Sequence, residues 1–150
     1  MQITSAMKMV SAAKLKKAQD KITQMRPYSE KLTEILQNVS GTLEGTDGKY
    51  SDEREVNKVL IIAVASNRGL CGGFNAYVNK KVGQLINETY AGKEVSVIAI
   101  GKKVSDFWGK RGNMEAEHNA LFDDLSFENV GEVAQSIMDG FANGKYDRVE

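Results

Sequence analysis

The sequence contains little of several residue types: its 150 residues include one cysteine, one histidine, one proline and one tryptophan. One cysteine excludes an intrachain disulfide framework and cannot assemble a metal cluster. Long apolar runs are also missing, because the longest, Val59–Ala65, is far shorter than the roughly 18 residues that cross a bilayer. We therefore expect no cofactor, no metal and no direct membrane insertion.

A net charge is missing too, since 20 Lys and Arg balance 20 Asp and Glu. Such a chain has no overall field to attract nucleic acid or an anionic membrane. The balance conceals an asymmetry. Residues 1–26 contain six basic residues and one acidic residue, whereas residues 27–57 contain three basic and seven acidic residues. Binding to polyanions would therefore depend on the basic N-terminal segment.

A long helix is predicted from Met1 to about Leu43. Apolar residues recur there in a four-three alternation, which is typical of a coiled-coil seam and calls for a partner helix. Pro27 removes one backbone hydrogen bond, but the seam keeps its phase across it, so we expect a kink rather than a break. The seam consists of Ala18, Ile22, Met25, Leu32, Leu36 and Val39, with Ser29 in its one polar slot.

The remainder of the chain alternates strands and helices after a polar, glycine-rich connector. Alternation of this kind predicts an α/β fold with a Rossmann-like parallel sheet and flanking helices. We expect the long helix in residues 1–44, the connector in 45–57 and the α/β domain in 58–150. The expected strands are 59–65, 95–100 and about 114–117, and the expected helices are about 75–90, 103–111 and 129–143.

The last residues, Tyr146–Glu150, have the character of the start of a further strand after the Asn143-Gly144 turn. The sheet is therefore expected to be incomplete at the C-terminus, and a second long helix, antiparallel to the first, is expected in missing sequence. Without that helix, the apolar stripe of the first helix is expected to promote self-association.

The most distinctive segment is Ser66-Asn-Arg-Gly-Leu-Cys-Gly-Gly-Phe-Asn75. It occupies the place where doubly wound folds bind phosphates, so one hypothesis is a small α/β nucleotide- or phosphate-binding domain that uses the Gly69–Gly73 loop. The glycine spacing does not match G-x-G-x-x-G, and no Lys-Ser or Lys-Thr follows. Alternatively, the glycines permit a sharp exit from the sheet and Asn75 caps the next helix. Arg68 would then be a rigid fork for a partner's carboxylates.

Two single residues were candidates for catalysis. Cys71 has no base near it in the sequence, so it is expected to be a small packed side chain. His118 lacks any partner motif and is expected at the surface or at a sheet edge. Neither a Ser-His-Asp set nor a carboxylate pair stands out, and the chain is predicted to have no active site of its own.

The basic residues of the first helix allow three interpretations. Clustered cations are typical of an adaptor that binds nucleic acid or a membrane, although aromatic residues are absent there. They also fit the solvated face of an amphipathic helix. Third, a basic rod could lie in a protein cavity with acidic walls, where its methionine and alanine residues suit adaptable contact. The residues concerned are Lys14, Lys16, Lys17 and Lys21.

Three segments together carry a resemblance to a known family. They are Ile3–Gln19, Met25–Tyr28 and Ser66–Asn75. Their order and spacing resemble the gamma subunit of F-type ATP synthase across nearly the whole chain, and the glycine loop is the most specific of the three.

The resemblance implies a central-stalk, or rotor, subunit that couples proton-driven rotation to conformational change and ATP synthesis in an alpha/beta hexamer. It implies the alpha, beta and epsilon subunits and the membrane c-ring as partners, and no nucleic acid. The implied location is peripheral, on the cytoplasmic face of a bacterial inner membrane or the equivalent face of an organellar membrane. By position, Met7, Lys8, Met9 and Val10 would be shaft contacts, and Arg68, Gly69, Leu70, Cys71 and Gly72 would contact the beta subunits.

This sequence departs from the family pattern in two ways. Asn67 stands where the family more often has Asp, which removes a charge beside Arg68. Compared with that pattern, the first turns of the N-terminal helix are also expected in missing sequence.

Overall fold

The computed structural model describes residues 2–42, 49–50 and 54–150. The chain divides into two compact units, Met1–Ser51 and Asp52–Glu150, which are described separately. Most of the connector that the sequence predicts at 45–57 lies outside the described residues.

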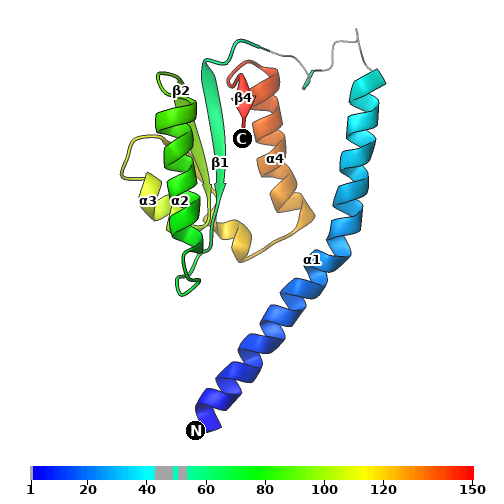
Figure 1. The fold of residues 1–150 in the computed structure, drawn as a ribbon, viewed down its shortest axis with the longest axis vertical. Coiled ribbons are helices and arrows are strands. Elements are labelled where there is room, and N and C mark those ends of the chain that lie inside the picture. Colours follow the sequence, from blue (N-terminus) through cyan, green and yellow to red (C-terminus); the bar gives the residue numbers. More distant parts are fainter. Residues whose placement is uncertain (1, 43–48, 51–53) are drawn as a thin grey trace. The chain divides into compact units, whose positions relative to one another are not determined.

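The first unit contains one long helix, α1 (Gln2–Thr42). It continues through Pro27, and Figure 1 shows it bending about midway along its length. Proline has no N–H for the carbonyl four residues earlier, at Thr23. The Thr23 hydroxyl itself donates to the Gln19 carbonyl at 3.0 Å, a contact that often accompanies helix bending. The predicted kink without a break is confirmed.

The second unit is a parallel sheet of four strands with helices around it (Figure 1). Its strands are β1 (Lys58–Val64), β2 (Glu94–Ile100), β3 (Met114–Glu117) and β4 (Arg148–Val149), in the order β3-β2-β1-β4. All three strand pairs are parallel, and the last residues of the chain do form a further strand beside β1. The predicted Rossmann-like α/β fold is confirmed.

The helices of this unit lie where the sequence predicts them, with shifted ends. They are α2 (Phe74–Gln84), a π-helical turn η1 (Leu85–Thr89), α3 (Lys102–Trp108), the 3₁₀ turn η2 (Asn119–Phe122) and α4 (Phe127–Ala142). α4 begins two residues earlier than expected because the Ser126 hydroxyl accepts a hydrogen bond from the Asn129 N–H and so caps it. The sequence did not predict η1 or η2.

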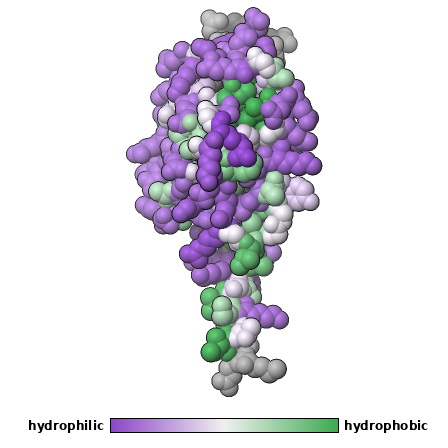
Figure 2. All heavy atoms as spheres, turned by 90° about the vertical axis from the view of Figure 1, so that its left-hand side faces the viewer, coloured by the Kyte–Doolittle hydropathy of each residue, from purple (hydrophilic) through white to green (hydrophobic). Residues whose placement is uncertain are grey.

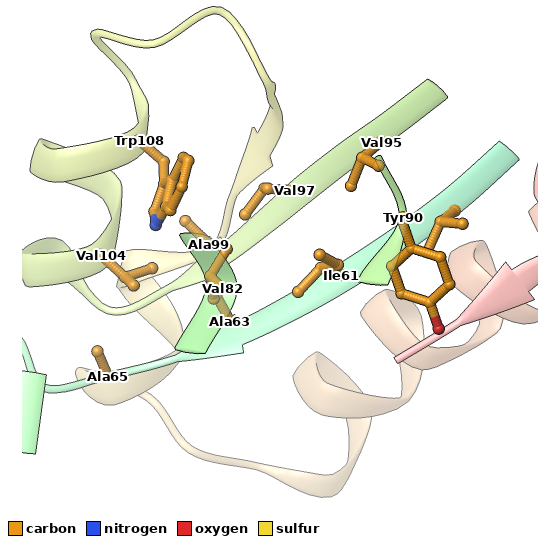
Figure 3. Packing of buried hydrophobic residues seen from close by; sticks show 11 residues of the cluster. Ile61, Ala63, Ala65, Val82, Tyr90, Val95, Val97, Ala99, Val104 and Trp108 are labelled. Atoms are coloured by element: carbon orange, nitrogen blue, oxygen red, sulfur yellow. The ribbon is translucent and has the colours of Figure 1, made fainter. Parts of the chain in front are cut away.

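β1 is buried on both of its faces, and this explains why its sequence is an unbroken apolar run. On one face, Val97 and its neighbours pack against Val82 of α2 and Trp108 of α3 (Figure 3). On the other face, Leu60 and Ile98 pack with Tyr146, and α4 contributes Ile137. Leu60 and Val97 are both 0% exposed. The sheet unit therefore has a hydrophobic core of its own.

Candidate subunit-contact site

The segment that follows β1 lies at the carboxyl edge of the sheet and leads into α2. Its backbone is tied to the neighbouring strand and helix. The Ala65 N–H donates to the Ile100 carbonyl at 2.8 Å, and the Lys103 N–H donates to the Ser66 carbonyl at 3.1 Å. Residues 68–72, which the sequence predicts to meet a partner, are called the contact loop below.

Ser66 and Asn75 close the base of this segment. The Ser66 N–H donates to Asn75 Oδ1 at 3.1 Å, and Asn75 Nδ2 donates to Ser66 Oγ at 2.9 Å. Ser66 Oγ also donates to the Arg68 carbonyl at 2.5 Å. The prediction that Asn75 caps the helix is wrong, because Gly73 is the N-cap of α2 and makes no side-chain cap. The Asn75 amide faces back to the end of β1 instead.

Two amide side chains join three loops at the same edge. Asn67 Oδ1 accepts the Lys102 N–H at 2.8 Å, at the start of α3, and Asn67 Nδ2 donates to the Asn119 carbonyl at 3.2 Å. Asn119 Oδ1 in turn accepts the Gly101 N–H at 3.2 Å. We call Asn67 and Asn119 the amide bridge. It connects the segment after β1 with the residues that follow β2 and β3.

Of the two glycines in the contact loop, only one is favoured by its backbone conformation. Gly72 has a left-handed φ of 60°, which favours glycine, whereas Gly69 has neither a left-handed φ nor any atom within 4 Å of an added Cβ. Leu70 also has a left-handed φ, of 62°, and its side chain is fully exposed. For a non-glycine residue this backbone is unfavourable. The left-handed backbone at Leu70 gave no signal in the sequence.

The side chains of the contact loop point to solvent. Arg68 and Cys71 are exposed, so the prediction that Cys71 packs inside is wrong. Its sulfur receives a hydrogen bond from Asn75 Nδ2 at 3.0 Å, which holds it at the base of the loop. Within the described part of the chain, the Arg68 guanidinium has no hydrogen-bond or ion-pair partner. The loop thus presents a cation and the apolar Leu70 on an anchored backbone.

The start of α3 is poorly suited to a phosphate. The first N–H groups of α3 already have acceptors. The Gly101 and Lys102 N–H groups donate to side chains of the amide bridge, and the Lys103 N–H donates to the Ser66 carbonyl. At the start of α2, the Phe74 N–H points to the Cys71 carbonyl at 3.4 Å. Anion sites at helix ends depend on free N–H groups. The start of α3 therefore does not favour the nucleotide hypothesis, whereas the start of α2 has no side-chain cap.

The predicted shaft residues all lie on the surface of α1. Met7, Met9 and Val10 are large exposed apolar side chains, and Lys8 is exposed beside them. Figure 2 shows hydrophobic side chains reaching the surface near the N-terminal end of α1. The seam from Ala18 to Val39 is exposed as well. The structure thus leaves both predicted contact sets accessible.

Titratable groups with shifted pKa values lie away from the contact loop, at the amino edge of the sheet. Glu115 accepts hydrogen bonds from Lys145 Nζ and the Tyr146 hydroxyl, each at 2.5 Å. Burial opposes ionisation of Glu115, but these two bonds outweigh it and lower the pKa of its carboxyl below the usual value. Burial and the bond to Glu115 raise the pKa of Tyr146. This network is structural, because it links β3 to the turn before β4.

Other candidate groups do not assemble into a catalytic or metal site in the described residues. His118 is half-buried and follows the edge strand β3. Its backbone N–H donates to the Ala99 carbonyl, so the expected position at a sheet edge is confirmed. No group of three or more His, Cys, Asp or Glu residues within the described part of the chain could hold a metal ion. Among the same residues, no helix is both long and apolar enough to cross a membrane.

Comparison with known proteins places the whole chain in one family. The sequence model described as ATP synthase matches residues 1–150. The chain belongs to the ATP synthase family. It is 58% identical to the ATP synthase gamma chain of Flavobacterium johnsoniae over 151 residues, covering 100% of this chain and 52% of that protein.

More distant relatives carry the same name. The ATP synthase gamma chains of Flavobacterium psychrophilum and Cytophaga hutchinsonii are 56% and 47% identical, over 100% and 99% of this chain and 52% of each relative. The chain therefore spans about half the length of the curated relatives it matches. The resemblance that the three sequence segments carry is confirmed.

Proposed function

We propose that this chain is the N-terminal part of a central-stalk subunit that couples proton-driven rotation to ATP synthesis in an alpha/beta hexamer. The observation that carries the proposal is the match to ATP synthase gamma chains over the full 150 residues. The two structural units support a division of work. α1 supplies a long exposed rod, and the sheet unit supplies an anchored loop with an exposed arginine.

In this proposal the chain acts through contact, without an active site of its own. A shaft with different side chains on its different faces touches each surrounding subunit differently, and rotation exchanges those contacts. A ligand or subunit shifts an equilibrium only by its different interaction with the two states. Met7, Lys8, Met9 and Val10 would make the shaft contacts, and the contact loop would meet the beta subunits.

The proposed partners are the alpha, beta and epsilon subunits and the membrane c-ring. The proposed location is peripheral, on the cytoplasmic face of a bacterial inner membrane or its organellar equivalent. Arg68 suits such an assembly because a guanidinium on a fixed backbone binds carboxylates with both geometry and charge.

The test is co-purification of the full-length form with separately expressed alpha and beta subunits. We expect one copy to enter a hexameric ATPase. Arg68→Ala should weaken this incorporation, and Lys110→Ala is the matched control, since Lys110 is an exposed cation that follows α3 at the other edge of the sheet. A folded wild-type protein that never joins the hexamer would overturn the proposal.

A further inference from the structure

The amide bridge has a second consequence, which rests on the proposed function. We infer that Asn67 and Asn119 are positioning residues for the contact loop: they hold Arg68 and Leu70 ready for the partner by fastening the loop to the ends of β2 and β3. Neither amide touches the partner in this inference. They act through the backbone that precedes Arg68.

The contact loop needs such support because its conformation is unfavourable by itself. Leu70 adopts a left-handed φ of 62°. Its side chain is fully exposed, so packing of that side chain does not offset the backbone strain. Gly69 and Gly72 add freedom on both sides of it. Strained backbone of this kind persists only where the surroundings fix it.

The surroundings fix the loop at both ends and leave its middle open. At the N-terminal end, Asn67 makes two hydrogen bonds to residues outside the loop, and Ser66 Oγ holds the Arg68 carbonyl. At the other end, Asn75 Nδ2 lies 3.0 Å from Cys71 Sγ. Between these anchors, the side chains of Arg68 and Leu70 are exposed. An interface residue held in its bound geometry loses less freedom on binding.

The side chain of Asn119 makes hydrogen bonds of its own, so Asn67 is bonded to a residue whose position is fixed. Its Oδ1 accepts from Gly101, and its Nδ2 donates to Glu117 Oε2 at 3.1 Å. Glu117 also accepts from the hydroxyl of Ser105, which is buried on α3. Gly101 lies close against the backbone of Ala65, since an added Cβ there would lie 2.1 Å from the Ala65 carbonyl oxygen. The contact loop is therefore fastened to the body of the sheet unit.

In this chain the side chain at position 67 both donates and accepts, which an amide can do. Asn67 Oδ1 accepts from a backbone N–H, while its Nδ2 donates to a carbonyl. A carboxylate has acceptors only, so an aspartate at 67 would keep the first bond and set an oxygen against the Asn119 carbonyl. An amide also places no negative charge next to Arg68. Asn67 therefore fastens the loop while leaving the guanidinium for a partner.

The first experiment measures amide hydrogen exchange of residues 68–72 in the free 150-residue chain. Asn67→Ala and Asn119→Ala each remove two side-chain hydrogen bonds, and they should speed exchange about three- to tenfold in residues 68–72 and at the Lys102 or Gly101 N–H that loses its acceptor. Asn67→Asp should also speed exchange in residues 68–72 while leaving the overall shape of the side chain intact. Tryptophan fluorescence of Trp108 checks that each variant is folded.

Asn113→Ala is the matched control. Asn113 Nδ2 donates to the Val95 carbonyl at 3.1 Å, a bond of the same type just before β3, at the opposite edge of the sheet. Its loss should leave exchange at 68–72 unchanged. Equal exchange in that control and in a folded Asn67→Asp chain would overturn the inference.

The second experiment measures the affinity of full-length variants for the alpha/beta hexamer. Asn67→Ala should weaken binding by about the factor by which it speeds loop exchange, with the stability of the core preserved. Faster exchange with unchanged affinity overturns the positioning role. A wild-type protein that does not bind overturns the proposed function instead, and the exchange data still decide whether the amide bridge holds the loop.

Discussion

α1 and the sheet unit are both rich in apolar residues, yet they bury them very differently. Every α1 side chain from Ile3 to Val39 is exposed, whereas the sheet unit buries residues from β1, β2, α2 and α3 in one continuous cluster. Most helical stability in proteins comes from packing an apolar face against another element. The sheet unit therefore contains the source of its own stability, while α1 must obtain its stability from a partner.

The largest expected difference comes from the same substitution in the two regions. Leu60→Ala should destabilise the sheet unit by about 2–5 kcal/mol, because Leu60 is 0% exposed and its removal leaves a cavity. Leu36→Ala should change that stability by less than about 0.5 kcal/mol, since Leu36 is 58% exposed. Urea unfolding followed by Trp108 fluorescence measures both, because the only tryptophan lies in the sheet unit. Similar losses in the two variants would abolish the contrast.

Pro27→Ala should act on α1 alone. It restores a backbone hydrogen bond inside the helix and removes a local penalty of about 3 kcal/mol, so the helical signal in far-UV circular dichroism should rise. The unfolding midpoint reported by Trp108 should stay the same. A shift of that midpoint would mean that the two units are energetically coupled.

Acid should affect the sheet unit through Glu115. Its pKa is lowered in the folded chain, so as the pH falls the unfolded chain takes up the proton first. The stabilisation is therefore complete above the unfolded pKa of about 4.3 and is lost as the pH falls through the folded value.

Replacing that carboxyl tests its share of the acid response. In Glu115→Gln, the free energy of unfolding should fall less below about pH 4 than in the wild type. The difference should be about 1 kcal/mol, the contribution of one hydrogen bond. Acid titration of Trp108 fluorescence measures it. An unchanged acid transition in the variant would show that Glu115 does not couple folding to pH.

The smallest expected effect is self-association through α1. The exposed seam should bring chains together weakly as concentration rises, and sedimentation velocity should detect this. Leu32→Asp with Leu36→Asp should keep the chain monomeric. Thr33→Asp with Gln37→Asp is the matched control, because it adds the same charge one position off the seam. A wild-type chain that stays monomeric over a wide range of concentration contradicts this expectation.

Periodicity and composition were sufficient to predict much of the fold. The four-three alternation in α1 and the apolar run of β1 are local patterns: the first indicates one apolar face, and the second indicates a strand buried on both faces. The same patterns predicted a bent helix that continues through Pro27 and a further strand near the C-terminus, and both are present (Figure 1). Family resemblance depended on short segments whose order is also visible in the sequence.

The candidate site was predicted less completely. The loop and its exposed arginine were placed correctly, but Asn75 was assigned to a cap and Cys71 to the interior. Both errors arise because the end of β1, which the Asn75 amide faces, is brought beside α2 only by the turn of the loop. The left-handed backbone at Leu70 has no compositional signal, since glycine is the residue that usually marks it.

The sequence by itself determined which segments are helices and strands, which faces are apolar and which family the chain resembles, because these properties depend on neighbours along the chain. The tertiary structure alone decided what fastens the contact loop. Asn67 and Asn119 are 52 residues apart, and they meet because parallel pairing brings the ends of β1, β2 and β3 to one edge of the sheet.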